Sequence, residues 1–240
     1  MELHDYEVIS FDCFGTLVDW ESGIVKSIRE GCQERCDGIL DKDLIGYFLS
    51  HESAILSETP DIPYRLALAK TYEGVLAELG VKCKEEHSRR FGASVIGWPI
   101  FPDTIDALSY LGSHHKLVVL SNIDEPSIES TKDRLRCDFF RTYTAQAIGT
   151  FKPSANNFRY LTDKLSQLHI PREKILHVSV SRFHDIDPAA AHGIDTAWIN
   201  RAGTANGTLS IHKGFRPKQK PTYQFSSLSE LVDSHKNSAL

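Results

Sequence analysis

An aspartate near the N-terminus stands where a carboxylate nucleophile could act. Residues 6–11 are apolar and β-branched enough to favour a buried strand, and Asp12 follows directly, with Gly15 and Thr16 in the turn behind it. An aspartate carboxylate can displace a leaving group from carbon and form an ester that water then hydrolyses. Phe14 stands two residues after Asp12, and its phenyl ring cannot carry a proton. The turn therefore predicts a nucleophile without a second acid beside it.

Other polar residues follow later apolar segments of the chain. Ligands of open parallel sheets bind at the carboxyl ends of the strands, so residues at these ends are candidates for the same site. Each taken alone is weak evidence, because such residues also cap helices and turns. Their joint order along the chain predicts that polar groups from four parts of the chain converge, namely Asp12, Ser121 with Asn122, Lys152, and the segment from Ser179 to Asp185.

Strand-like and helix-like segments alternate in the second half of the chain, and this alternation predicts the elements that position these residues. It favours an α/β fold, a parallel sheet with helices on both faces. Strands are expected at 6–11, 116–121, 142–147, 175–180 and 196–200, with helices at 103–111 and 156–168.

The stretch after the Asp12 turn has a different pattern. Residues 19–96 show helical periodicity and no convincing strand, which predicts a helical domain inserted into the sheet domain. The sheet domain then comprises 1–18 and 97–240. An apolar face on the helical insert would support a homodimer.

Composition limits the classes of partner. The 240 residues carry a net charge of -5 with a pI near 6.1, which gives no reason to expect nucleic acid as a partner. No apolar run reaches eighteen residues and the N-terminus does not resemble a signal peptide, so no membrane association is expected. Five cysteines without a CxxC pair favour reduced thiols. These features predict a cytoplasmic protein.

Four motifs of the chain resemble those of the haloacid dehalogenase superfamily. They are Phe-Asp-Cys-Phe-Gly-Thr-Leu-Val-Asp at 11–19, Leu-Ser-Asn at 120–122, Phe-Lys-Pro at 151–153 and His-Asp-Ile-Asp-Pro-Ala-Ala-Ala at 184–191. The aromatic residue followed by Gly-Thr after the first aspartate most resembles the 2-haloacid dehalogenase type. The resemblance implies a Rossmann-like core, a helical cap inserted after the first motif, and an active site between them.

The resemblance also gives the residues expected roles. Asp12 is the expected nucleophile, and Lys152 close to it would favour its ionised form and hold it in one orientation. Asp185 would orient Lys152 or accept a proton from the hydrolytic water. Donors for a substrate carboxylate are expected from Thr16, Ser121 and Asn122.

Further residues could complete the substrate site. An apolar wall that excludes water is expected from Phe14, Trp20, Phe158 and Phe183, although aromatic residues more often pack in a core. In the fourth motif Ser181 and His184 offer polar groups, and His184 is either a second proton carrier or a histidine satisfied within its loop.

The residues expected to hold a metal are incomplete. Superfamily phosphatases hold magnesium with the nucleophile, a backbone carbonyl and acids of the fourth motif, and they use a second acid of the first motif as acid/base catalyst. This chain has Phe14 in place of that catalyst and Val180 in place of the earlier acid of the fourth motif. A hard divalent ion prefers oxygen ligands and would find a poor site. Metal-independent chemistry without a cofactor is therefore expected, unless a shifted alignment brings Asp187 into the site.

Two residues typical of 2-haloacid dehalogenases are missing. Those enzymes carry an arginine on an early cap helix near the leaving group, but no arginine lies between Asp37 and Tyr64. Arg65 is the nearest replacement, although a surface role is at least as plausible. Phe158 stands where family members place a tyrosine. These differences leave the nucleophile intact and make the leaving group uncertain.

Four functions follow from these observations. The leading hypothesis is a hydrolase in which Asp12 attacks the carbon next to a small carboxylate and releases a halide. The same attack could open a strained ring, such as an aziridine or epoxide acid. A magnesium-dependent phosphatase and a catalytically inactive ligand-binding protein are the remaining alternatives.

Overall fold

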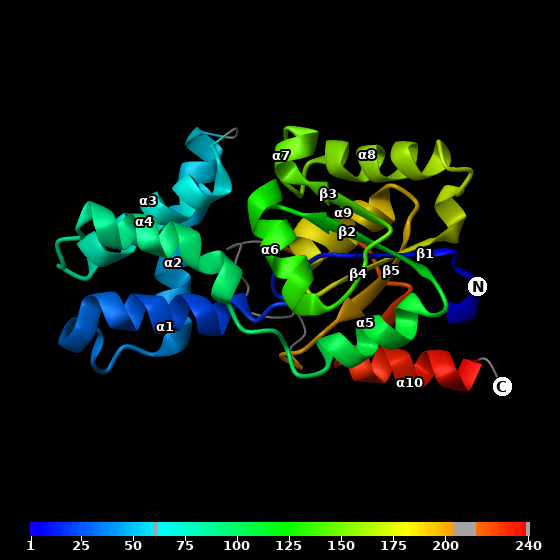
Figure 1. The fold of residues 1–240 in the computed structure, drawn as a ribbon, viewed down its shortest axis with the longest axis horizontal. Coiled ribbons are helices and arrows are strands. Elements are labelled where there is room, and N and C mark those ends of the chain that lie inside the picture. Colours follow the sequence, from blue (N-terminus) through cyan, green and yellow to red (C-terminus); the bar gives the residue numbers. More distant parts are fainter. Residues whose placement is uncertain (60–61, 204–214, 239–240) are drawn as a thin grey trace. The chain divides into compact units, whose positions relative to one another are not determined.

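The structure is a computed structural model that describes residues 1–59, 62–203 and 215–238. By internal contacts the chain forms two compact units. One comprises Met1–Val18 together with Ile100–Leu240 and contains the sheet, and the other comprises Asp19–Pro99 and is helical (Figure 1).

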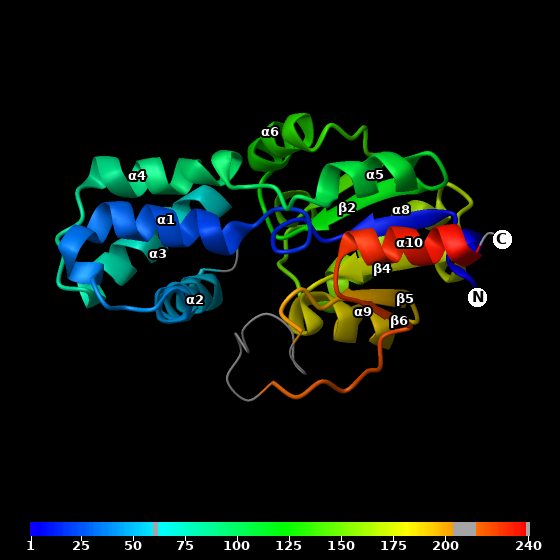
Figure 2. The same cartoon turned by 90° about the horizontal axis from the view of Figure 1, so that it is seen from below.

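A six-stranded sheet organises the first unit. Every neighbouring pair of strands is parallel, and the strand order is β3-β2-β1-β4-β5-β6 (Figures 1 and 2). This arrangement confirms the predicted α/β fold and places β1 at the centre of the sheet. The strands are β1 Val8–Phe11, β2 Lys116–Ser121, β3 Arg141–Thr144, β4 Ile175–Ser179, β5 Asp195–Ile199 and β6 Tyr223–Phe225.

Helices cover both faces of this sheet, as expected for parallel strands joined by crossovers. Figure 1 shows α5 and α10 on one side and α8 and α9 on the other. The helices of the sheet unit are α5 Thr104–Gly112, α6 Glu125–Leu135, α7 Ala145–Ile148, α8 Ala155–Ser166, α9 Asp187–Ala191 and α10 Leu228–Ser238.

The core beneath α8 shows how alternate residues of the strands face it. Phe158 and Leu161 of α8 pack against Val8 of β1 and Ile175 of β4, and all four side chains are fully buried. Side chains two residues apart on a strand share a face. Ser10 and His177, two residues beyond Val8 and Ile175, are therefore polar residues on this apolar face, and they are paired in the strand register.

The third predicted strand, 142–147, extends too far. The structure ends β3 at Thr144, because the Thr144 hydroxyl accepts a hydrogen bond from the Ala147 N–H and caps α7. Thr144 thus ends the strand and begins the helix. Strand β6 was not predicted, because its three residues are too few to show a periodic pattern.

Four main helices build the second unit. Aromatic rings pack between them: the centroid of Trp20 lies 6.2 Å from that of Phe48, and Phe91 stacks on Tyr72 at 4.4 Å. Among the described residues, no helix of either unit combines the length and apolar character needed to cross a bilayer. The helices are α1 Trp20–Cys32, α2 Asp41–Glu58, α3 Tyr64–Glu78 and α4 Glu85–Ala93.

Two of the cysteines lie close together. Cys32, at the end of α1, and Cys36 have Cα atoms 5.8 Å apart, a separation that a disulfide can span. Four residues across a helix end bring the two side chains together, and the reduced state of their thiols stays a prediction. Cys13, Cys83 and Cys137 are free.

Candidate active site

Asp12 follows the central strand β1 and is held from two sides. Its N–H donates to the carbonyl of Val178 at 3.0 Å, which continues the β1–β4 pairing. The Thr16 hydroxyl donates to Oδ2 of Asp12 at 2.8 Å. Gly15, with a φ of 95°, makes the turn that brings Thr16 back to Asp12. The Thr16 hydroxyl, expected to bind substrate, is thus used to orient the nucleophile.

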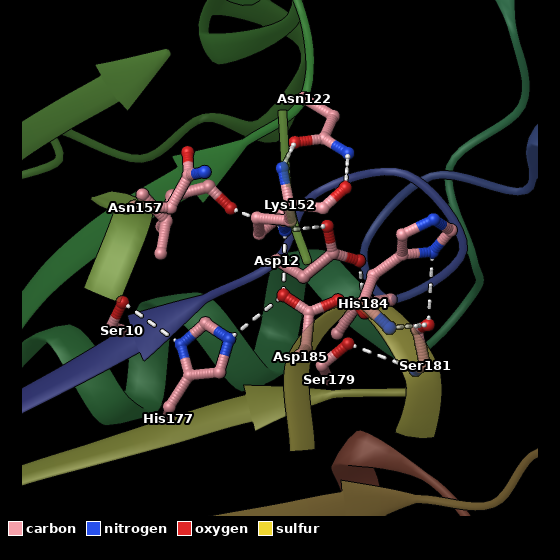
Figure 3. A network of polar contacts seen from close by, with 12 residues as sticks. Ser10, Asp12, Asn122, Lys152, Asn157, His177, Ser179, Ser181, His184 and Asp185 are labelled. Atoms are coloured by element: carbon pink, nitrogen blue, oxygen red, sulfur yellow. Dashed lines mark hydrogen bonds and ion pairs between the residues drawn. The ribbon is translucent and has the colours of Figure 1, made fainter. Parts of the chain in front are cut away.

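Lys152 lies next to Asp12 and is buried. Its Nζ donates to Oδ1 of Asp12 at 2.8 Å, to Oδ1 of Asp185 at 2.7 Å and to the Leu120 carbonyl at 2.9 Å. Three acceptors satisfy the three donors of an ammonium group. Figure 3 shows the carboxylates of Asp12 and Asp185 both directed at this nitrogen. The structure thus brings together the three residues predicted to be catalytic.

Asn122 holds the backbone at Lys152. Its Oδ1 accepts from the Lys152 N–H at 2.6 Å, and its Nδ2 donates to the Lys152 carbonyl at 3.0 Å (Figure 3). Both the oxygen and the nitrogen of the Asn122 amide are thus bonded to the backbone of Lys152 and fix its position. Asn122 therefore positions Lys152, whereas its sequence position predicted a donor to the substrate. Ser121, the last residue of β2, is buried beside it.

Asp185 lies in a single π-helical turn, Arg182–Ile186, and is 1 % exposed. Its Oδ1 accepts from Lys152 and lies 3.0 Å from Nε2 of His177. The Nδ1 atom of His177 lies 3.2 Å from the Ser10 hydroxyl. The polar cluster therefore runs from the nucleophile through Lys152 and Asp185 to a buried histidine on β4.

Burial and charge act against each other in this cluster. Burial raises the pKa of Asp12 above its usual value; Lys152 and Thr16 lower it, while the charge of Asp185 raises it further. Burial also opposes ionisation of Asp185, but Lys152 and the His177 contact hold the pKa of Asp185 below its usual value. Burial disfavours the charged lysine, yet the two carboxylates raise the pKa of Lys152. Lys152 is therefore a cation, and Asp185 an anion.

The turn that carries Asp185 is held by serine and histidine. The Ser181 hydroxyl accepts from the His184 N–H at 3.0 Å and lies 3.3 Å from Nδ1 of the His184 ring. Ser179 accepts from the Ser181 N–H at 3.0 Å (Figure 3). The His184 ring also packs edge-on against Phe183. His184 is thus satisfied within its loop in the structure, one of the two interpretations that the sequence left open.

The aromatic residues expected in the pocket wall lie in different places. Phe14 is half-buried in the turn after β1. Phe158 is completely buried, and its ring meets the ring of His177 at an angle of 86° with centroids 5.6 Å apart. Because no part of Phe158 is exposed, its side chain supports the polar cluster from the core and lines no open wall. This is a correction to its expected contact with substrate.

Two of the predicted substrate residues belong to the helical unit. Trp20 begins α1 and packs on Phe48. Arg65 lies in the first turn of α3 and is half-buried, and its carbonyl lies against Gly92 of α4. Their contacts within the helical unit are structural, and a role with substrate stays a prediction for both.

Sequence reasoning missed three residues that shape the cluster. His177 and Ser10 form the end of the network described above. Arg201 donates from Nη2 to the Thr16 carbonyl at 3.0 Å and pairs through both terminal nitrogens with Asp103, so it holds the turn behind the nucleophile. One signal in the sequence could have indicated His177. It is a polar residue in an otherwise apolar strand, at a position where a strand facing the core would carry an apolar side chain.

The donor set does not fit a magnesium ion. Oδ1 of Asp12 accepts from Lys152 and Oδ2 accepts from Thr16, while Phe14 and Val180 supply no ligand through their side chains. Within the described ranges, no group of three or more histidine, cysteine, aspartate or glutamate residues is arranged to hold a metal. Among the described residues of this cluster, Oδ2 of Asp185 is the carboxylate oxygen without a hydrogen-bond partner, and a divalent ion that takes about six oxygen ligands would find few here.

Comparisons with solved structures identify the fold. The chain is similar to the magnesium-bound HAD-hydrolase YfnB from Bacillus subtilis (17% identity, 96% of this chain and 99% of that chain, TM-score 0.74). It is also similar to L-2-haloacid dehalogenase from Xanthobacter autotrophicus (17%, 95% and 97%, TM-score 0.76) and to the defluorinating L-2-haloacid dehalogenase Rha0230 (14%, 96% and 95%, TM-score 0.77). No curated protein sequence gives a significant match.

The family follows from the sequence itself. A family model described as haloacid dehalogenase-like hydrolase matches residues 6–193, which include the polar cluster and the whole helical unit. This match covers most of the chain and agrees with the four motifs, with the parallel sheet and with the fold of the dehalogenases above. The chain belongs to the haloacid dehalogenase-like hydrolases.

Proposed function

We propose that the protein is a hydrolase in which Asp12 attacks the carbon next to a small carboxylate and forms an ester intermediate. One observation carries this proposal. Lys152 and Thr16 hold the carboxylate of Asp12, and position 14, where a phosphoryl-transfer enzyme of this family would have an acid, is a phenylalanine. A nucleophile without a neighbouring proton donor suits leaving groups that depart without protonation, and halide is such a group.

The first step forms a carbon–oxygen bond. A carboxylate oxygen of Asp12 displaces the leaving group, whose bond to carbon breaks with both electrons, so that a halide departs as an anion. Lys152 keeps the carboxylate oriented, and a nucleophile held in the reacting geometry lowers the entropic part of the barrier. The substrate is then esterified to Asp12.

The second step breaks the ester. Water adds to the carboxyl carbon of Asp12 while Asp185 accepts its proton, and the substrate oxygen leaves with a proton as a hydroxy acid. The oxygen that Asp12 gains comes from water. Asp185 suits this role because its Oδ2 atom is buried and has no hydrogen-bond partner among the described residues.

The structural neighbours support carbon chemistry. The Xanthobacter autotrophicus dehalogenase has also been solved with chloropropionic acid covalently bound, and the chain resembles that structure with a TM-score of 0.76. At 17% identity this likeness concerns the fold, so the bond that is cleaved has to be tested in this chain.

The second candidate function is the opening of a strained ring, because groups that 2-haloacid dehalogenases have near the leaving group are missing from this chain. No arginine lies between Asp37 and Tyr64, and Phe158 brings no hydroxyl to the cluster. A strained three-membered ring supplies part of the driving force for its own opening and needs no halide site. Aziridine-2-carboxylate and glycidate therefore belong among the test substrates.

The test is a substrate panel run with and without chelator. Both enantiomers of 2-chloropropionate, the two strained-ring acids and p-nitrophenyl phosphate are incubated with the protein, with EDTA or with added magnesium. Turnover of a halo acid or a strained acid in EDTA supports the proposal. Turnover of the phosphate ester alone, dependent on magnesium, would overturn it in favour of a phosphatase.

Two variants show whether the turnover belongs to Asp12. Asp12→Asn should lower the rate by about a thousandfold or more, since loss of a nucleophile has effects of this order. Asp106→Asn changes an exposed carboxylate on α5 and should leave the rate unchanged. If neither wild type nor variant turns over any acid but both bind one, the protein is a binding protein.

A further inference from the structure

His177 occupies a site for which the two proposed steps give no role. It lies on β4, is completely buried, and contacts a polar partner on each side of its ring: Asp185 at Nε2 and Ser10 at Nδ1 (Figure 3). The ring of Phe158, from α8, packs edge-to-face against the ring of His177. Burying an imidazole costs free energy unless both nitrogens are hydrogen-bonded, so this arrangement is specific.

The direction of these hydrogen bonds follows from the partners. An ionised carboxylate only accepts, so Nε2 of His177 carries a proton and donates it to Oδ1 of Asp185. A hydroxyl can donate or accept, so Ser10 satisfies Nδ1 in either state of the ring. The histidine is therefore a buried donor towards Asp185 on the central strand β4.

Because His177 donates to Asp185, the two oxygens of the Asp185 carboxylate differ in their hydrogen bonding. Oδ1 accepts from both Lys152 and His177, while Oδ2 is buried and has no partner among the described residues. An unsatisfied buried carboxylate oxygen is costly and is expected to meet a water or a reacting group. The two nitrogen donors thus determine which oxygen of Asp185 is left free.

We propose that His177 is the positioning residue of ester hydrolysis, holding Asp185 so that Oδ2 accepts the proton of the attacking water. This inference rests on the proposed function. The proton moves from water to Oδ2 and then to the departing substrate oxygen, so Asp185 is regenerated and His177 keeps its own proton throughout. The charged groups around the ring are Asp185 and, beyond it, Lys152 and Asp12.

This role separates the two chemical steps. Ester formation needs Asp12 and Lys152, neither of which His177 contacts by hydrogen bonding. Ester hydrolysis needs Asp185 in one orientation, and a small misplacement of a reacting group can cost about a hundredfold in rate. Loss of His177 should therefore slow the second step and let the ester accumulate.

The experiment is a rapid-quench time course on the whole protein with the best substrate of the panel, in which mass spectrometry follows the ester on Asp12. His177→Phe removes the donor and keeps an aromatic ring in the core. His177→Gln keeps an N–H donor the same number of bonds from Cα. Ser10→Ala removes the partner at Nδ1. Thermal melts of each variant report on folding.

The expected result is selective. His177→Phe should form the ester at nearly the wild-type rate and hydrolyse it about a hundredfold more slowly. His177→Gln should recover much of the hydrolysis rate, with Ser10→Ala between wild type and His177→Phe. Hydrolysis as fast in His177→Phe as in wild type overturns the inference, and so does an equal slowing of both steps, which indicates a merely structural residue.

Failure of the proposed function looks different. If wild type forms no ester with any substrate, the proposed function fails, whatever the variants do. If wild type forms and hydrolyses the ester but His177→Phe does not accumulate it, only the role of His177 fails. Should His177→Phe not fold, the comparison of His177→Gln with Ser10→Ala decides, since loss of orientation predicts the slower hydrolysis in Ser10→Ala.

Discussion

Nζ of Lys152 lies 2.8 Å from Oδ1 of Asp12, and both side chains are buried. The lysine also forms an ion pair with Asp185, so one cation is shared by two carboxylates that are far apart in the sequence. Because the three groups compensate one another, removing the cation affects folding as well as chemistry.

Lys152→Met should destabilise the protein. It leaves two buried carboxylates without their cation, and breaking a buried pair from one side costs about 3–5 kcal/mol. Urea denaturation at neutral pH measures the free energy of unfolding. Asp185→Asn in the Lys152→Met background should recover part of the loss, because it removes one unpaired charge.

Lys26→Met is the matched control, since Lys26 is an exposed lysine on α1. It should change the free energy of unfolding by less than about 0.5 kcal/mol, as surface substitutions usually do. A similarly small change in Lys152→Met would show that the shared ion pair contributes nothing to the fold.

The rate of ester formation should begin to fall, as the pH is lowered, at a higher pH than it would if Asp12 had the pKa of a free aspartate. Asp12 must be ionised to attack, and burial together with the charge of Asp185 raises the pKa of Asp12. The rate of the first step should therefore fall as the pH drops towards this raised pKa, above the ordinary value of about 3.9.

Single-turnover rates of ester formation from pH 3.5 to 7 measure this dependence. Asp185→Asn removes a neighbouring negative charge, so it should shift the midpoint of the fall in rate to lower pH, provided that Lys152 keeps its contact with Asp12. A midpoint in the wild type at or below the pKa of free aspartate would contradict the electrostatic description of the site.

Chelation should leave turnover of the best acid unchanged, because the ligands that magnesium needs are missing. Phe14→Asp combined with Val180→Asp supplies two carboxylates near Asp12, since Thr16 bonds both Asp12 and the Val180 N–H. Added magnesium should raise the melting temperature of the double variant, because a ligand that binds the folded state stabilises it. Wild type should show no shift, and an equal shift in wild type would show that a metal site exists.

Much of the site was predictable from sequence. Asp12 and Asp185 come after the buried strands β1 and β4, and Lys152 lies in the loop between α7 and α8. The parallel sheet brings the residues that follow its strands to one edge, where the three side chains meet. The division into a sheet unit and a helical unit could also be expected, because a change from period two to period 3.6 is visible over long segments.

Other features depended on contacts that no local pattern encodes. Asn122 looked like a substrate donor, but its amide closes on the backbone of Lys152, thirty residues away. Phe158 looked like a pocket wall but lies in the core against His177, because the face of α8 that it occupies packs on the sheet. The role of a side chain depends on which face is buried, and that is a property of the fold.

A histidine pair at the opposite edge of the sheet unit should make stability depend on pH. Nδ1 of His115 lies 2.9 Å from the Tyr6 carbonyl, so it donates, and Nε2 then accepts from His235 at 2.8 Å. The Tyr110 hydroxyl completes the chain at Nδ1 of His235, 3.1 Å away. Both rings are neutral in this network.

Burial lowers the pKa of both rings, that of His235 to about 4. A histidine of the unfolded chain titrates near 6.5, so between about pH 6.5 and 4 the unfolded state binds protons that the folded state does not. The free energy of unfolding should therefore fall as the pH drops through this range. His235→Gln should flatten the fall, and His87→Gln, an exposed histidine of α4, should not. Equal slopes in wild type and His235→Gln would contradict this account.

The most direct test of the central claim is a single turnover in water labelled with heavy oxygen. Excess enzyme is mixed with the best substrate, the peptide that contains Asp12 is isolated, and its mass is measured. The ester mechanism predicts one labelled oxygen in Asp12 and an unlabelled product, because water attacks the carboxyl carbon of Asp12. Label in the product and none in Asp12 would mean that water attacks the substrate directly, and the account would be wrong.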